Sequence, residues 1–248
     1  MDCLLKKQNT LIVIPARYNS HRLPGKILEE LHGFPMIYWV YNQALKAQSG
    51  PVVVAADDPK VFKVLDILGI PYVETDPACK NGTERVYEVA KKYPKKKYFI
   101  NCQGDEPLLN PHIIQEVATS GLVDNAFKTA VSPISEKVNN PNEVKVAMSF
   151  DNRIRFASRN LIPCAGDKEI ELFKIHGVYM YSKDLLERFV TASPGPLEIL
   201  ESVEQLRCIE HDIPLVGVKT EYTERSVDTY RDLVYMRELD PKLFKCFD

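Results

Sequence analysis

Short apolar segments alternate with segments of helical periodicity over residues 11–120, and this alternation restricts the fold more than any other feature. The apolar segments, each typical of a buried strand, cover residues 11–15, 51–56, 71–74 and 98–102. Helical signals occupy the intervals, at 35–47, at 59–68 and from about residue 83. Strands that alternate with helices in this way pair in parallel and are covered on both faces. We therefore predict an α/β fold with a mostly parallel, doubly wound sheet of the Rossmann type.

The second half of the chain has a different pattern. Segments 144–150 and 153–158 flank Asp151-Asn152, which predicts a hairpin with a tight turn. Beyond it we predict strands at 173–181 and 214–220, and helices at 184–191, at 196–210 and from Asp228 onward. In the helix at 196–210, we expect Ile199, Val203 and Leu206 to share one face. No linker is long or polar enough to separate domains. We predict one domain over residues 1–248, with a core at about 11–130, an insertion at about 131–215 and a closing strand and helix at 216–248.

A cationic loop follows the first predicted strand and carries Arg17, Arg22 and Lys26. A loop in this position, at the carboxyl end of a parallel strand, is where an α/β sheet binds a phosphorylated ligand. Gly25 is its only glycine, so the loop matches neither the P-loop pattern nor the dinucleotide G-x-G-x-x-G pattern. Its cations, rather than a glycine-rich backbone, would hold the phosphates. The alternative is a basic loop exposed to solvent.

Asp105 comes after the strand at 98–102, directly behind Gly104, and so is placed at the same sheet edge as the cationic loop. A carboxylate beside a phosphate site repels the ligand unless a divalent cation lies between them, and Mg²⁺ is typically held by one or two carboxylates plus phosphate oxygens. Asp228 is a second candidate ligand. Its alternative role is the N-cap of the last predicted helix.

Two further residues have open alternatives. Arg85, near the start of the segment GTERVYEVA, could contact a phosphate or sugar, or could be a solvated residue of a helix whose capping box begins at Thr83. His176 lies within an apolar strand and is interpreted as a core histidine. We find no Ser/His/Asp or Cys/His arrangement typical of nucleophilic catalysis.

Composition excludes several classes of protein. The net charge of −2 and the pI of about 6.2 argue against a nucleic-acid-binding protein. The chain has no apolar run of about 18 residues, and its first residues lack the apolar segment of a signal peptide, so we expect a cytoplasmic protein outside the membrane. The six cysteines fit neither a zinc site nor a disulfide framework and are expected to be free thiols: Cys3, Cys79, Cys102, Cys164, Cys208 and Cys246.

The order of several motifs resembles that of the CMP-KDO synthetases, or 3-deoxy-manno-octulosonate (KDO) cytidylyltransferases, from about residue 11 to residue 237. The motifs are IPARYNSHRLPGK, AADD, GTERVYEVA, NCQGDEPLLNP, VKVAM, RIRFASRNLIP, PLEILESVEQLRCIEH and VDTYRDL. The resemblance implies a nucleotide-diphospho-sugar transferase-like fold, with the nucleotide bound by the core, and the sugar pocket and dimer contacts in the insertion. It also implies a homodimer that uses CTP, Mg²⁺ and a keto-deoxy sugar acid.

The same resemblance implies a role for each matching residue. The CTP triphosphate would be bound by Arg17, Ser20, Arg22 and Lys26, with Ala16 also near the nucleotide. The cytosine and ribose side would be lined by Asn81, Gly82 and Arg85, and Gln103 would face both nucleotide and sugar. The sugar acid would be bound by Arg159, Tyr179 and Glu198. Mg²⁺ would be held by Asp105 and Asp228, so the resemblance favours metal binding over helix capping for Asp228. The catalytic residues would be these two aspartates with Arg22 and Lys26.

Three positions depart from the family pattern near the expected sugar pocket: Ile175, Ile199 and Cys164. The histidine that the family carries at position 175 is displaced to His176, and a shift by one residue in a strand turns a side chain to the other face. The expected reaction is CMP transfer from CTP to the anomeric 2-hydroxyl of KDO, for lipopolysaccharide or capsule synthesis. Alternatives are a modified KDO such as 8-amino-KDO, another ulosonic acid or a phosphonate as acceptor, or a nucleotide-binding regulatory subunit without activity.

Overall fold

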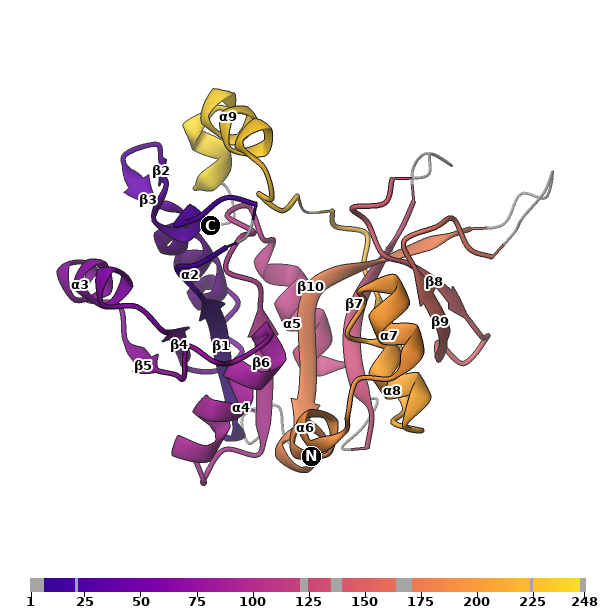
Figure 1. Cartoon of the computed structure of the whole chain (residues 1–248). Coiled ribbons are helices and arrows are strands. Elements are labelled where there is room, and N and C mark those ends of the chain that lie inside the picture. Colours follow the sequence, from indigo (N-terminus) through magenta and orange to yellow (C-terminus); the bar gives the residue numbers. More distant parts are fainter. Residues whose placement is uncertain are drawn as a thin grey trace.

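The computed structural model describes residues 7–20, 22–120, 125–134, 140–163, 171–223 and 225–245 (Figure 1). Within those residues, nine strands form one mixed sheet whose main path runs β11-β7-β10-β6-β1-β4-β5. In the same residues, every helix falls short of the length and apolarity that crossing a bilayer requires. Cys79, Cys102 and Cys208 are free thiols, as predicted, whereas Cys3, Cys164 and Cys246 lie outside the described residues.

The first half of the chain forms the parallel part of the sheet, which confirms the predicted alternation. The strands are β1 (Thr10–Ala16), β4 (Val52–Ala56), β5 (Tyr72–Glu74) and β6 (Tyr98–Cys102), and all of their pairings with one another are parallel. The connecting helices are α2 (Met36–Lys46), α3 (Pro59–Leu68), α4 (Gly82–Lys92) and α5 (Pro111–Thr119). Gly69 ends α3 with a φ of 65°, a left-handed conformation that glycine adopts without strain.

Two apolar cores lie on the two faces of this sheet. Because side chains alternate along a strand, Leu11 and Val13 of β1 pack on the face covered by α4 and by α6 (Lys183–Thr191). Ile12 and Ile14 pack on the opposite face, against α2, α3 and α5. The sheet is thus buried on both sides.

An antiparallel strand joins the two halves of the sheet. β10 (Phe173–Ser182) lies between β6 and β7 (Phe127–Pro133) and is antiparallel to both, whereas β11 (Leu215–Lys219) is parallel to β7. The predicted hairpin is confirmed as β8 (Lys145–Met148) and β9 (Ile154–Ser158), with Asn152 in the turn at a φ of 62°. β10 is bulged: Ile175 pairs with Val131 but Tyr179 pairs with Thr129, so four steps along β10 match two along β7.

The prediction of one helix over residues 196–210 is wrong. Two short helices, α7 (Pro196–Glu201) and α8 (Leu206–Glu210), are separated by residues 202–205, and the break begins at Ser202, whose φ is 52°. Val203 and Leu206 are buried, but Ile199 is 66% exposed and does not share their face. The break coincides with a tertiary contact, because the carbonyls of Glu201 and Ser202 accept hydrogen bonds of 3.0 Å each from Arg159 and not from the next turn of a helix.

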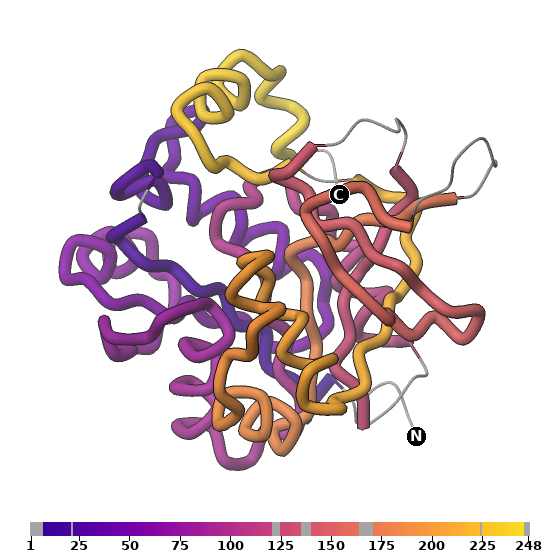
Figure 2. The backbone as a smooth tube through the Cα atoms, turned by 45° about the vertical axis from the view of Figure 1, so that its right-hand side comes forward, coloured from indigo at the N-terminus to yellow at the C-terminus, as the bar shows by residue number. Residues whose placement is uncertain are grey.

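The segment 225–245 returns to the first half of the chain. It contains α9 (Tyr230–Glu238) and the short helix η2 (Pro241–Phe244), and it packs beside the hairpin formed by β2 (Glu30–Leu31) and β3 (Phe34–Pro35). Figure 2 follows the backbone from β11 across the molecule to α9. The contact is an apolar cluster that includes Leu31, Met36, Trp39, Val227, Leu233, Met236 and Phe244. This return brings Asp228 next to the cationic loop.

Candidate active site

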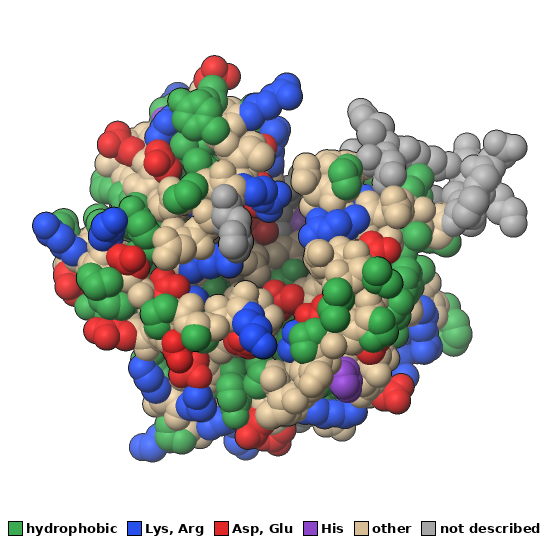
Figure 3. Space-filling view, in the orientation of Figure 1, with side chains coloured by type: hydrophobic (Ala, Val, Ile, Leu, Met, Phe, Trp, Pro, Cys, Tyr) green, Lys and Arg blue, Asp and Glu red, His purple; other side chains and the backbone are tan. Residues whose placement is uncertain are grey.

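Two cavities meet at the carboxyl edge of the parallel strands. The smaller, of about 660 Å³, is lined by residues that include Arg17, Lys26, Asn81, Gly82 and Arg85. The larger, of about 770 Å³, is lined by residues that include Glu143, Arg159, Lys174, His176, Tyr179 and Asp228. Gln103 and Asp105 line both. The space-filling view shows the hollow between the part of the molecule that carries α9 and the part that carries the β8–β9 hairpin (Figure 3).

Lys26 is the centre of a charged cluster where the cavities meet. Its Nζ donates to Asp105 Oδ2 at 2.5 Å, to the carbonyl of Val227 at 2.9 Å and to Asp228 Oδ1 at 3.3 Å. Arg22 Nη2 also donates to Asp228 Oδ1, at 2.7 Å. The Lys26 side chain is only 11% exposed, so the alternative of a fully solvated basic loop is wrong for this residue. The structure therefore brings together all four residues predicted to be catalytic.

Local sequence explains why the two carboxylates are available. Thr229, not Asp228, is the N-cap of α9, and it forms a capping box with Asp232. The cap alternative for Asp228 is therefore wrong, and its carboxylate is left to the cationic loop. Gly104 lets the end of β6 approach the end of β1, because a Cβ at this position would lie 2.6 Å from the carbonyl oxygen of Pro15.

The paired carboxylates fit a magnesium ion. Asp105 and Asp228 already converge on one cationic atom, the Lys26 Nζ, which marks a point where positive charge is stabilised. Across the described ranges, no group of three or more His, Cys, Asp or Glu side chains is arranged to hold a metal. Two carboxylates, with substrate phosphate oxygens and water completing the coordination, are the donor set that Mg²⁺ commonly takes in nucleotide sites.

Arg85 is buried rather than solvated. Its side chain is 2% exposed, and it donates to Asp57 Oδ2 at 2.8 Å and to Thr75 Oγ1 at 2.6 Å. Asn81 is the N-cap of α4, with its side chain accepting from the backbone N–H of Glu84 at 2.8 Å. The alternative of a capping box beginning at Thr83 is therefore wrong. Arg85 and Asn81 both line the smaller cavity from fixed positions.

Glu204 lines the smaller cavity and is not among the predicted site residues. Its Oε2 accepts a hydrogen bond from Thr83 Oγ1 at 2.8 Å. Burial raises the pKa of its carboxyl to about 7, although the Thr83 bond acts in the opposite direction. No local pattern marks this residue, since it lies in the irregular turn between α7 and α8 that the sequence suggests is helical.

Among the residues expected to bind the sugar acid, Arg159 and Tyr179 line the larger cavity and Glu198 does not. Arg159 donates to the carbonyls of Glu201, Pro141 and Ser202, at 2.9–3.0 Å. Glu198 is bound at both carboxylate oxygens by Arg207, at 2.6 and 2.7 Å, and this pair is nearly buried. Ala16 and Ser20 are buried beside the cationic loop and line neither cavity.

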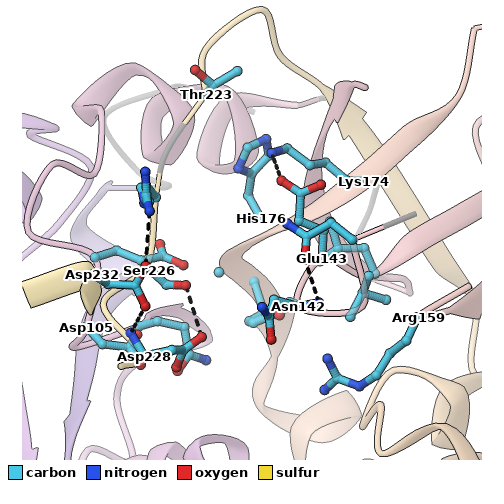
Figure 4. A pocket seen from close by; sticks show the side chains of 18 residues that line it. Asp105, Asn142, Glu143, Arg159, Lys174, His176, Thr223, Ser226, Asp228 and Asp232 are labelled. Carbon is cyan, nitrogen blue, oxygen red and sulfur yellow. Dashed lines mark hydrogen bonds and ion pairs between the residues drawn. The ribbon is translucent and has the colours of Figure 1, made fainter. Parts of the chain in front are cut away.

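The bulge in β10 changes the consequence of the displaced histidine. Ile175, His176 and Gly177 all line the larger cavity, because the strand loses its strict alternation between Ile175 and Tyr179. His176 is thus both buried, at 3% exposure, and part of the cavity wall. Next to it, Lys174 Nζ donates to Glu143 Oε1 at 2.6 Å, and Figure 4 shows this pair across the cavity from Asp105 and Asp228.

Comparison with known proteins gives consistent matches over most of the chain. Residues 11–216 match the cytidylyltransferase family. The 3-deoxy-manno-octulosonate cytidylyltransferase of Elusimicrobium minutum is 37% identical over 234 residues, which cover 91% of this chain and 95% of that protein. The protein of the same name from Vibrio parahaemolyticus is 38% identical over 245 residues, with coverage of 93% and 98%. A solved structure of CMP:2-keto-3-deoxy-manno-octonic acid synthetase complexed with CTP has a TM-score of 0.86 and 32% identity, with coverage of 93% and 97%.

Proposed function

The chain belongs to the cytidylyltransferase family, among the 3-deoxy-manno-octulosonate cytidylyltransferases, and from this premise we propose that it transfers CMP from CTP to KDO. The products are CMP-KDO and pyrophosphate. The relatives carry this activity in their names and align over more than nine-tenths of this chain. The observation that carries the proposal is the position of Lys26, Asp105 and Asp228 at the junction of two cavities, one on the side of the cationic loop and one on the side of the insertion.

In the proposed mechanism, CTP occupies the smaller cavity and the sugar acid occupies the larger one. Arg17, Arg22 and Lys26 neutralise the triphosphate, while Asn81 and Gly82 line its nucleoside side. The anomeric 2-hydroxyl oxygen attacks the α-phosphorus and loses its proton to water, and the bond from the α-phosphorus to the bridging oxygen of pyrophosphate breaks. Such a transfer needs positioning and charge neutralisation more than a protein nucleophile.

We also propose Mg²⁺ as the cofactor, held by Asp105 and Asp228. When bound, it would act as a Lewis acid on the α-phosphate. Lys26 must leave these carboxylates as the ion and the triphosphate enter, and the triphosphate oxygens offer its ammonium a new partner. The Lys26 ammonium thus moves from the carboxylates to the triphosphate. Binding of the metal ion frees Lys26 for the nucleotide, and binding of the nucleotide frees the carboxylates for the metal ion, so each favours binding of the other.

The first experiment measures pyrophosphate release from CTP and Mg²⁺ with KDO, with KDO-free and EDTA controls. We expect release that requires both KDO and the metal. Asp105→Asn should retain less than about a tenth of the wild-type rate, a barrier increase of at least about 1.4 kcal/mol. No release by wild-type protein that still binds CTP would instead favour another sugar acid or a phosphonate as acceptor. No release with any acceptor would favour a regulatory subunit.

We further propose a cytoplasmic homodimer. Ile199 and Leu200 support the dimer, because these apolar side chains on α7 are 66% and 81% exposed. Sedimentation equilibrium should give twice the mass of one chain, and a monomer at enzymatically active concentrations would contradict it.

A further inference from the structure

We propose that the ion pair between Lys174 and Glu143 binds the exocyclic diol of the sugar acid and so selects acceptors that carry this diol. This inference rests on the proposed function. It concerns the wall of the larger cavity that faces the charged cluster of Lys26, and it adds Lys174 and Glu143 to the acceptor site as specificity-determining residues.

The orientation of the acceptor follows from its own chemistry. In an octulosonic acid the carboxylate and the reacting 2-hydroxyl are attached to the same carbon, so both lie at the end of the sugar that meets the α-phosphate. The exocyclic diol is carried on C6, across the ring oxygen from C2, and it is the longest arm of the sugar. In the larger cavity, Asp105 and Asp228 lie on one side, and Lys174 and Glu143 lie on the other (Figure 4). In an acceptor poised for attack at the first side, this arm is the part of the sugar that we place against the second.

The pair offers what two neighbouring hydroxyl groups need. A lysine ammonium carries three donors, of which Lys174 uses one on Glu143 Oε1 at 2.6 Å. The Glu143 carboxylate is an acceptor with two oxygens, and its side chain is 32% exposed. One hydroxyl can accept from the ammonium while its neighbour donates to the carboxylate. Lys174 is 16% exposed, so these bonds would form at a largely desolvated surface, where hydrogen bonding to charged groups is strong.

The other two cations of this cavity among the described residues are held by other groups of the protein. Arg159 donates from three nitrogens to three backbone carbonyls. Arg225 donates to Asp232 Oδ1 at 3.1 Å and lies over the Tyr235 ring, 4.0 Å from its centroid. Lys174 donates to the Glu143 carboxylate and keeps two of its three donors for a ligand.

A buried lysine fixes the position of the pair. Lys145, which is 1% exposed, donates from Nζ to the carbonyls of Asn140, Glu143 and Arg159, at 2.5–2.8 Å. These bonds hold the loop that carries Glu143 against β8, and β8 pairs with β10 at Lys174. The donor and the acceptor are thus set on backbone whose spacing does not depend on the ligand, which is the arrangement that selective hydrogen bonding requires.

The test compares two acceptors, KDO and 8-deoxy-KDO, in which hydrogen replaces the terminal hydroxyl. For wild-type protein we expect kcat/KM to favour KDO by about tenfold or more, since a site built to bind a hydroxyl rejects the analogue that lacks it. In Lys174→Met and Glu143→Ala the preference should fall below about threefold, with the KM for CTP unchanged. Lys174→Arg, which keeps a donor, should retain part of the preference. Lys91→Met is the matched control, because Lys91 forms an exposed ion pair with Glu88 on α4.

The outcomes separate the inference from a structural role and from the proposed function. If the pair only braces the cavity wall, both variants lose activity with KDO and 8-deoxy-KDO alike and keep the wild-type preference, which overturns the inference. A wild-type enzyme without any preference also overturns it. Wild-type turnover of KDO supports the proposed function in either case, and a protein that turns over no sugar acid overturns both.

Discussion

Glu204→Gln tests how burial affects an ionisable group beside the smaller cavity. Burial raises the pKa of the Glu204 carboxyl from an ordinary 4.5 to about 7. Glutamine keeps an oxygen that accepts the hydrogen bond from Thr83 Oγ1, now 2.8 Å from Glu204 Oε2, and removes the group that ionises. We expect the variant to be more stable than the wild-type protein at alkaline pH.

The sign and the size follow from proton linkage. The native carboxyl holds its proton more tightly than the unfolded one, so its stabilising effect is fully present below pH 4.5 and is lost as the pH rises through about 7. A rise in pKa of this size corresponds to about 3 kcal/mol. Because Glu204 lines a cavity that water can enter, this is an upper bound. The advantage of the variant in unfolding free energy should therefore grow by as much as about 3 kcal/mol between pH 4.5 and pH 8.

Urea denaturation between pH 4.5 and pH 8.5 measures this difference for wild-type protein and for Glu204→Gln. Glu221→Gln is the control, because it removes an exposed carboxylate. A difference between Glu204→Gln and wild type that stays constant over this pH range would refute the assigned cause. So would a change of equal size in the control.

Three further substitutions test the cluster, the sheet edge and the turn between α7 and α8. Lys26→Met should abolish turnover. It should also make Mn²⁺ bind the CTP-free protein about tenfold more tightly, as measured by electron paramagnetic resonance, because the ammonium no longer occupies the paired carboxylates. An unchanged Mn²⁺ affinity would contradict this. Gly104→Ala should destabilise the protein by about 1–3 kcal/mol in urea, because its Cβ would meet the carbonyl of Pro15. Gly82→Ala is the comparison for stability, because the nearest atom to its added Cβ is 3.4 Å away, an ordinary contact. Glu198→Ala should cost about 3–5 kcal/mol by leaving Arg207 buried without its partner, and a cost below about 1 kcal/mol would mean that solvent reaches the guanidinium.

The parallel core could be predicted from the sequence because its signals are local. The strand at 98–102 has the bounds of β6, and the helix at 59–68 has the bounds of α3. A buried apolar run and a helix closed by Asp58 and Gly69 need no information from the rest of the chain. Asp105 could be placed at the sheet edge for the same reason, because it follows closely on a strand that is recognisable from its own residues.

The features that the sequence did not reveal have tertiary causes. The ion pair of Arg22 and Asp228 joins residues 206 positions apart, and it depends on how α9 packs. The break at Ser202 depends on Arg159, whose hydrogen bonds replace those of a continuing helix. The capping box of α9 differs from these features, because its cause is local. Thr229 is followed three residues later by Asp232, a spacing that is visible in the sequence.

The packing of segment 225–245 gives the protein an internal optical reporter. Trp39 is the single tryptophan of the chain; it is 5% exposed and lies 5.2 Å from Phe244 between ring centroids. The segment that covers it also carries Asp228, so the environment of the indole depends on whether this carboxylate is in place. Intrinsic fluorescence of the unlabelled protein therefore follows assembly of the charged cluster, in equilibrium titrations and in stopped flow.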